Sequence, residues 1–170
     1  MEVLKAIEIA LENESKERDF YLRNSERTKN PIGKKMFATI AGEEDDHYNH
    51  FKQLHESLSG TQKWPENISA IVKGTEIKKA LAKLDSMPDD SSVLDIDDNE
   101  AIKIAIEFEK GGYAFYTKLK ENAESEDEKK FFGQLAQVEY SHLSSLEDTL
   151  LYFEDPEAWH AKHEGSNLDG

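Results

Sequence analysis

The sequence contains no cysteine, comparatively few basic residues and no long apolar run. A chain without cysteine has no disulfide framework, no thiolate zinc site and no iron–sulfur centre of its own. Its 21 lysines and arginines stand against 36 aspartates and glutamates, which gives a net charge of -15. Since a chain without a basic face cannot displace phosphate counterions, this balance argues against nucleic acid and anionic membranes as partners. The excess of carboxylates instead suits cations.

The N-terminus and the hydropathy pattern give no sign of membrane insertion or export. No apolar run approaches the roughly 20 residues that a membrane-spanning helix needs. Met1-Glu2-Val3 opens directly into a charged amphipathic pattern rather than a signal peptide. We therefore expect a cytoplasmic protein with no membrane partner. Its 170 residues fit one compact domain with a sizeable core.

The chain is an internal repeat with an offset of 95 residues. In each half, a glutamate is followed thirty residues later by a second glutamate, and three residues after that by a histidine. The two sets are Glu14, Glu44 and His47 in the first half, and Glu109, Glu139 and His142 in the second. The same offset relates apolar positions, including Phe20 with Phe115 and Phe37 with Phe132. We infer that the two halves share one structural plan.

Apolar residues recur at helical spacing in four long segments, which predicts an all-α fold. The segments are 2–29, 31–59, 98–123 and 126–154. We expect a ferritin-like four-helix bundle over residues 1–154, built from two repeated helical hairpins, 2–59 and 98–154. The long crossover, 60–97, is too rich in glycine, proline and polar residues to be one helix, but Thr75–Leu84 has the composition of a short extra helix.

Capping residues mark both hairpin turns. Asn30-Pro31 fits a cap followed by proline in the first turn of a helix, and Ser125 with Glu128 three residues later reads as a capping box. The tail, residues 155–170, is polar apart from Trp159, and we expect it on the surface or at a subunit contact. Trp64 and Trp159 fall outside the four-helix pattern, so they are candidates for such a contact or for capping the bundle.

The spacing of the repeated glutamates predicts that all four carboxylates meet at one level of the bundle. Glu14 and Glu44 lie at equal distances from the first hairpin turn, and Glu109 and Glu139 lie at equal distances from the second. At a rise of 1.5 Å per residue, each glutamate is about 22 Å from its turn. The spacing of three residues places each histidine beside a glutamate on the inward face. Six ligands would then surround two cations about 3.5–4 Å apart.

Cations would remove the large cost of burying unpaired carboxylates in an apolar interior. Carboxylate oxygens with one imidazole for each metal suit iron or manganese, and the absence of thiolates argues against a structural zinc site. Other charged residues near the ligands are expected to face solvent. Within the run 43–47, only Glu44 and His47 should point inward. We expect Glu12 and Glu107 to be an exposed pair, and His50 and His55 to be exposed rather than bound to metal.

One glutamate from each of two helices and Glu-x-x-His from the other two resemble the ferritin-like di-iron carboxylate proteins. The chain is most similar to the rubrerythrin group, in which a tyrosine follows the glutamates of the first and third helices by seven residues. Here Tyr21 follows Glu14 and Tyr116 follows Glu109 at that spacing. The resemblance covers both hairpins. It implies two iron ions held by the six ligands, hydrogen bonds from Tyr21 and Tyr116 near them, and reduction of hydrogen peroxide or dioxygen.

Two departures from rubrerythrins change what the resemblance implies. Rubrerythrins proper carry a cysteine-rich rubredoxin domain, which this chain lacks, so its electrons would come from an external donor such as a rubredoxin or a reductase. Rubrerythrins also have a further glutamate ligand three residues after the first-helix or the third-helix ligand. Glu17 occupies that position in the first repeat and Gly112 in the second. Glu17 is therefore a candidate seventh ligand, with a solvated or supporting role as the alternative.

Three functions stay open on the sequence alone. The first is a di-iron oxidoreductase that reduces peroxide or dioxygen, and the analogy with the family implies a homodimer. The second is an iron-handling protein that oxidises ferrous iron and passes it on, as ferritins do. The third is a metal-stabilised interaction module without turnover. The missing electron-transfer domain weakens the first, but nothing in the sequence shows the cage contacts that storage needs, so we rank them in this order.

Overall fold

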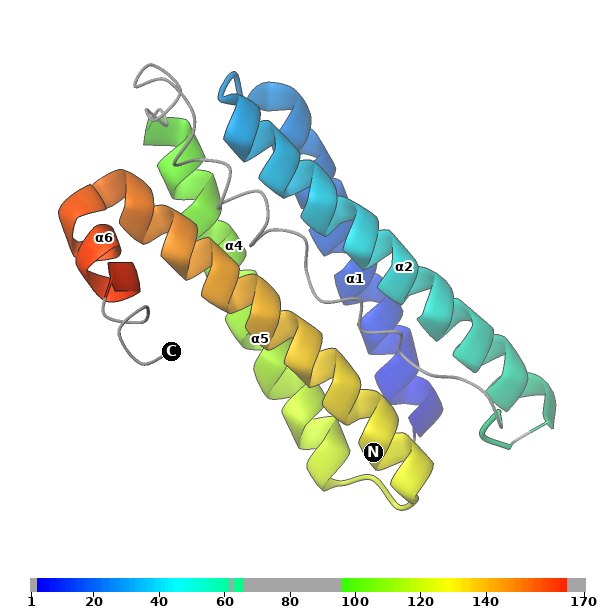
Figure 1. Cartoon of the computed structure of the whole chain (residues 1–170). Coiled ribbons are helices and arrows are strands. Elements are labelled where there is room, and N and C mark those ends of the chain that lie inside the picture. The colour runs from blue at the N-terminus through cyan, green and yellow to red at the C-terminus, as the bar shows by residue number, and fades with distance from the viewer. Residues whose placement is uncertain (1–2, 62, 66–95, 165–170) are drawn as a thin grey trace.

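Four long helices form two antiparallel hairpins that pack into one bundle (Figure 1). The computed structural model describes residues 3–61, 63–65 and 96–164. The elements are α1 (Val3–Arg27), α2 (Pro31–Thr61), α4 (Ile96–Glu121), α5 (Glu126–Glu154) and α6 (Pro156–Glu164). Every regular element in these residues is a helix, which confirms the predicted all-α, ferritin-like bundle. The short helix predicted at 75–84 lies outside the described residues.

Side-chain caps begin the second helix of each hairpin, at equivalent positions of the repeat. Asn30 Oδ1 accepts hydrogen bonds from the amides of Ile32 at 2.9 Å and Gly33 at 3.1 Å. Ser125 Oγ accepts one from the amide of Glu128 at 3.1 Å. The capping box differs in one detail from the expected form, because the Glu128 carboxylate accepts from the amide of residue 124, one position before the cap. Both turns are thereby fixed by local polar contacts.

Two apolar clusters fill the bundle, and the repeated glutamates lie between them along each helix. On α1, for example, Ala10 belongs to one cluster and Tyr21 to the other, with Glu14 between them. Each cluster takes side chains from all four long helices. Apolar layers on both sides keep water away from the glutamates, which strengthens every electrostatic interaction there.

The C-terminal segment differs from the predicted polar tail, because residues 156–164 form helix α6 and bury Trp159. The indole Nε1 of Trp159 donates a hydrogen bond to Asp148 Oδ2 on α5 at 3.0 Å, and its ring packs edge-on against Tyr152. Trp64 packs edge-on against Phe131, with ring centroids 5.5 Å apart. Both tryptophans thus contact the bundle of their own chain, as in the capping alternative. A hydrogen-bonded indole on an apolar surface explains the burial of Trp159.

No helix in the described residues has both the length and the apolar character needed to cross a membrane.

We predict that Asn30→Ala lowers the free energy of unfolding by about 1 kcal/mol, because two amides at the start of α2 lose their acceptor. Urea denaturation of the two proteins measures the difference. Asn30→Ser is the matched control, since serine is the cap at the equivalent position of the second hairpin and should retain most of the stability. Equal losses for both variants would show that the cap does not contribute.

Candidate metal centre

The four long helices bring the six repeated glutamates and histidines together in the middle of the bundle. Glu14 comes from α1, Glu44 and His47 from α2, Glu109 from α4, and Glu139 and His142 from α5. All six side chains are buried, with relative exposures of 6% for His47 and at most 1% for the other five. Carboxylates are almost never buried to this degree without a partner of opposite charge. The sequence prediction that they meet at one level therefore agrees with where the structure places them.

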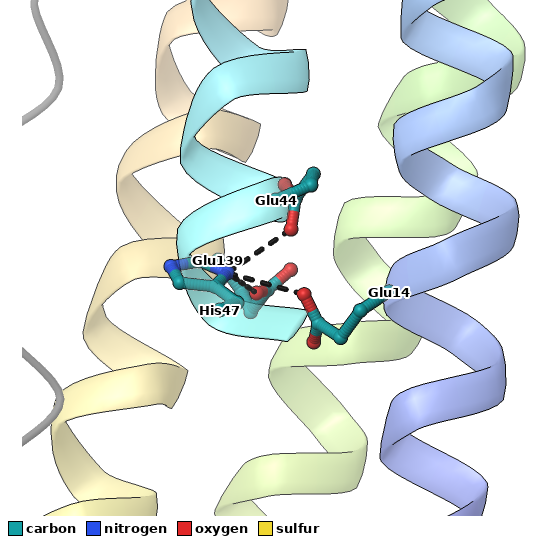
Figure 2. Close-up of side chains that lie close together, drawn as sticks. All are labelled: Glu14, Glu44, His47 and Glu139. Atoms are coloured by element: carbon teal, nitrogen blue, oxygen red, sulfur yellow. Dashed lines mark hydrogen bonds and ion pairs between the residues drawn. The ribbon is translucent and has the colours of Figure 1, made fainter. Parts of the chain in front are cut away.

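His47 is at the centre of the first group of ligand atoms, shown in Figure 2. Its Nδ1 lies 3.2 Å from Glu14 Oε2, 3.0 Å from Glu44 Oε2 and 3.8 Å from Glu139 Oε1. One ligand atom from each of these four residues lies within 4.8 Å of the others. Side chains from α1, α2 and α5 thus converge on one point.

His142 organises a second group with Glu44 and Glu109. Its Nδ1 lies 3.1 Å from Glu44 Oε1 and 3.3 Å from Glu109 Oε2. Glu44 therefore takes part in both groups, with Oε2 toward His47 and Oε1 toward His142. The two imidazoles are nearly parallel, with ring centroids 6.1 Å apart. One carboxylate thus offers an oxygen to each of the two groups of candidate ligand atoms.

Two buried tyrosines tie the hairpins together through the glutamates. The hydroxyl of Tyr21 on α1 donates a hydrogen bond to Glu109 Oε1 on α4, and that of Tyr116 on α4 donates one to Glu14 Oε1 on α1. Burial and the neighbouring carboxylates raise the pKa of both phenols well above the ordinary value. Both hydroxyls therefore keep their protons. Each hydroxyl orients the glutamate of the opposite hairpin. Both tyrosines thus lie near the centre, as the resemblance to rubrerythrins implied.

The carboxylates and imidazoles perturb one another strongly. Burial, followed by the charge of Glu44, raises the pKa of Glu14 to about 7. Burial, followed by the charges of Glu109 and Glu44, raises the pKa of Glu139 well above its ordinary range. Burial opposes the charge on His47, but Glu44 and Glu14 outweigh it and raise its pKa to about 10. Burial also opposes ionisation of Glu44, yet the two histidines hold its pKa below the ordinary value. In the metal-free centre, Glu14, Glu139 and His47 therefore tend to hold protons, while the shared Glu44 stays ionised.

The donor atoms at this centre fit a divalent metal. Several buried atoms have no hydrogen-bond partner among the described residues: Glu44 Oε1, Glu109 Oε2, both carboxylate oxygens of Glu139, and His142 Nδ1. Leaving such groups unsatisfied is costly. Glu44 Oε1 and Glu109 Oε2 face His142 Nδ1, and Glu139 Oε1 faces His47 Nδ1. Oxygen donors with a minority of imidazole nitrogens are a common ligand set for divalent cations. Metal ions would satisfy these atoms together.

Glu17 lies beside the centre but outside the two groups of ligand atoms. Burial, followed by the charges of Glu44, Glu14 and Glu109, raises its pKa to about 11, and His142 acts in the opposite direction. The Glu17 side chain is half-buried, which agrees with this influence of the nearby ligands on its pKa. Its equivalent in the second repeat, Gly112, leaves room for a ligand, since a Cβ there would lie 2.6 Å from Glu139 Oε2.

Glu43 is a site residue that sequence reasoning missed. The charged run 43–47 was expected to have only Glu44 and His47 pointing inward, but the Glu43 carboxylate contacts Nε2 of His142 across the bundle. The Glu43 side chain is only 20% exposed. The available signal was that residues 43 and 47 are four apart and so share a helix face. The repeat concealed it, because the equivalent of Glu43 is Val138.

Other expectations about polar residues near the centre have mixed outcomes. Glu12 and Glu107 are exposed, as predicted. Each also pairs with a lysine on its own helix. His50 and His55 were expected to be exposed, but both are half-buried. His55 Nε2 lies 3.4 Å from Glu8 Oε1, and His50 joins neither group of ligand atoms. Neighbouring side chains partly cover both imidazole rings, but neither ring belongs to the centre.

We predict that the metal-free protein loses stability as the pH rises from about 5 to about 8. Glu14, Glu17, Glu139 and His47 hold protons more tightly in the folded chain, so unfolding releases protons and the free energy of unfolding falls with rising pH. The loss of stability begins above the ordinary glutamate pKa of 4.5. It continues up to the folded-state pKa of each group, which is about 7 for Glu14 and about 10 for His47. Glu44, whose pKa is lowered, has the opposite effect: its contribution to stability is lost as the pH falls below 4.5.

Thermal unfolding in the presence of a chelator, repeated across this pH range, measures the effect. Glu14→Gln should flatten the profile, because one of the proton-binding groups is removed, and saturating divalent metal should remove most of the decline. A melting temperature that rises from about pH 5 to about pH 8 would contradict the assignment of protons to the centre.

Comparison with known proteins identifies the family to which the chain belongs. The family model for rubrerythrin matches residues 5–150, which is most of the chain and includes all six glutamates and histidines and both tyrosines. No curated protein and no solved structure gives a match. The duplicated Glu and Glu-x-x-His pattern, its burial in a four-helix bundle and the family match agree with one another. The chain therefore belongs to the rubrerythrin family.

Proposed function

We propose that the chain is a di-iron oxidoreductase that reduces hydrogen peroxide or dioxygen with electrons from an external donor. The observation that carries this proposal is the pair of adjacent, buried ligand groups that share Glu44. Two neighbouring iron ions that each give up one electron would together supply the two electrons that reduce peroxide. Membership of the rubrerythrin family supports iron as the metal. Manganese is the alternative that the same oxygen-rich ligand set would accept.

The described residues divide between two metal positions. Glu14, Glu44, His47 and Glu139 would hold one ion, and Glu44, Glu109 and His142 the other. We propose Glu17 as a seventh ligand or an exchanging one, since its carboxyl interacts with Glu44, Glu109 and His142. When bound, a pair of ferrous ions supplies two electrons as both become ferric. An external rubredoxin or reductase would return those electrons, because this chain has no cysteine.

The protein side chains would position the ligands and hold protons. Reduction of hydrogen peroxide to two waters consumes two electrons and two protons. The Tyr21 and Tyr116 hydroxyls retain their protons and point at Glu109 and Glu14, so they keep these carboxylates oriented. The Glu17 carboxyl, with a pKa of about 11, carries a proton at neutral pH in the metal-free chain. The two apolar clusters exclude water from both sides.

Iron oxidation and handling is the second candidate function, and the net charge of -15 favours it by attracting cations. Anaerobic loading with ferrous iron followed by rapid mixing separates the two. Faster oxidation of two irons for each chain by hydrogen peroxide supports the peroxidase, and faster oxidation by dioxygen supports an oxidase or ferritin-like role. Failure to bind iron stoichiometrically would overturn both.

We predict that Glu109→Ala loses bound metal, because one position keeps only the shared Glu44 and His142. His50→Ala is the matched control, since His50 is half-buried two turns from Glu44 on α2 but joins neither ligand group. Metal content after anaerobic loading and desalting, measured for each purified variant, gives the result. Equal metal content in the two variants would refute the ligand assignment.

A further inference from the structure

The two halves of the metal centre are unequal in their surroundings, although the ligands repeat. The repeat departs from symmetry at two positions beside the centre, where Glu17 corresponds to Gly112 and Glu43 to Val138. At both, the first repeat supplies a carboxylate and the second supplies a residue with no polar side-chain group. The question is which half of the centre these two carboxylates serve.

Glu43 serves His142 alone. His142 is fully buried, its Nδ1 faces Glu44 and Glu109, and its Nε2 contacts the Glu43 carboxylate. For His47, the position equivalent to Glu43 is Val138, a buried apolar residue that offers no acceptor. Among the described residues, every recorded polar contact of His47 is made by Nδ1. Among residues 3–61, 63–65 and 96–164, His142 is thus the one ligand histidine with a carboxylate on its outer nitrogen.

Glu17 does not distinguish the two halves. The ligands that perturb its pKa are the shared Glu44, Glu14 of the first group, and Glu109 and His142 of the second. The contact of Glu43 with His142 is therefore the departure from symmetry that is confined to one half of the centre.

We propose that Glu43 is a positioning residue for His142 and makes the two metal positions unequal, so that the Glu109–His142 position depends on Glu43 and the Glu14–His47 position does not. The proposal rests on the metal centre of the proposed function. A carboxylate on the outer nitrogen fixes the ring orientation and the tautomer, which leaves the inner nitrogen as the lone-pair donor, and it increases the basicity of that donor. Partners of this kind are typically worth about 10–100-fold in metal affinity.

Anaerobic calorimetric titration of the full chain with Mn²⁺ tests this directly, without relying on turnover. The wild type should bind two ions. Glu43→Val, which installs the residue found in the other repeat, should weaken one of the two dissociation constants by about tenfold or more and leave the other nearly unchanged. Glu43→Gln should weaken the same constant less, because an amide oxygen still accepts from Nε2 but carries no charge. Its near-identical shape guards against a general loss of folding.

Asp46→Val is the matched control for Glu43→Val. Asp46 is exposed on the same helix, one turn away, and its removal changes the net charge by the same amount. Both dissociation constants should stay close to those of the wild type. An effect of Asp46→Val as large as that of Glu43→Val would show that general charge, rather than the contact with His142, is responsible, and would overturn the proposal.

A double-mutant comparison identifies the position that Glu43 serves. In a His47→Ala background, Glu43→Val should weaken the remaining Mn²⁺ binding about tenfold or more, and in a His142→Ala background it should change it little. Equal effects in both backgrounds, or two unchanged constants in Glu43→Val alone, would overturn the proposal while leaving the metal centre intact. A wild type that binds no Mn²⁺ and no Fe²⁺ would overturn the metal centre itself, and the proposal with it.

Discussion

Repulsion among four buried carboxylates is the constraint on which the rest of this structure depends. Glu14, Glu44, Glu109 and Glu139 lie together between two apolar clusters, where water cannot screen them. Without cations, the chain can relieve the repulsion only by holding protons, and the raised pKa values of Glu14, Glu139 and His47 show where it holds them. Metals and protons are thus alternative occupants of one charged centre, and binding of one releases the other.

The repeat forms this centre by using one short pattern of residues twice. Each hairpin brings one glutamate from its first helix and one Glu-x-x-His from its second, at equal distances from a capped turn. Two such hairpins facing one another bring six candidate ligands together, all of them on helices. Two copies of one plan would by themselves give two identical metal positions. The first repeat removes this symmetry with Glu17 and Glu43, for which the second repeat has Gly112 and Val138, and Glu43 contacts His142.

Most of the fold and the convergence of the six glutamates and histidines could be predicted from the sequence, because both depend on local and periodic signals. The apolar periodicity indicated the four helices, and Asn30 and Ser125 marked the starts of two of them. The fixed spacing of the repeat predicted that the six glutamates and histidines lie at one level. These features need only the rise of a helix and the length of a turn. No knowledge of the partner helix is required to reach them.

The features that the sequence did not reveal depend on contacts between helices. Glu43 belongs to a charged run that looks like a solvated surface, and only the placement of α5 against α2 brings it to His142. Trp159 sits in a polar segment, and its burial requires a hydrogen-bond partner, Asp148, on a different helix. Likewise the partner of each tyrosine is set by how the hairpins face one another. Such pairings follow from how the helices pack, and a single sequence does not show which helix faces meet.

The crossed tyrosine bonds have a consequence for how the hairpins assemble. Tyr21 holds Glu109 and Tyr116 holds Glu14, so each hairpin carries the donor that the other needs. A slip of one hairpin by a single helical turn, about 5.4 Å, would break both bonds at once and leave two buried hydroxyls and two carboxylates unsatisfied. The two hydrogen bonds together therefore fix the register of one hairpin against the other. They select the one alignment of the hairpins in which the ligands are level, even before any metal arrives.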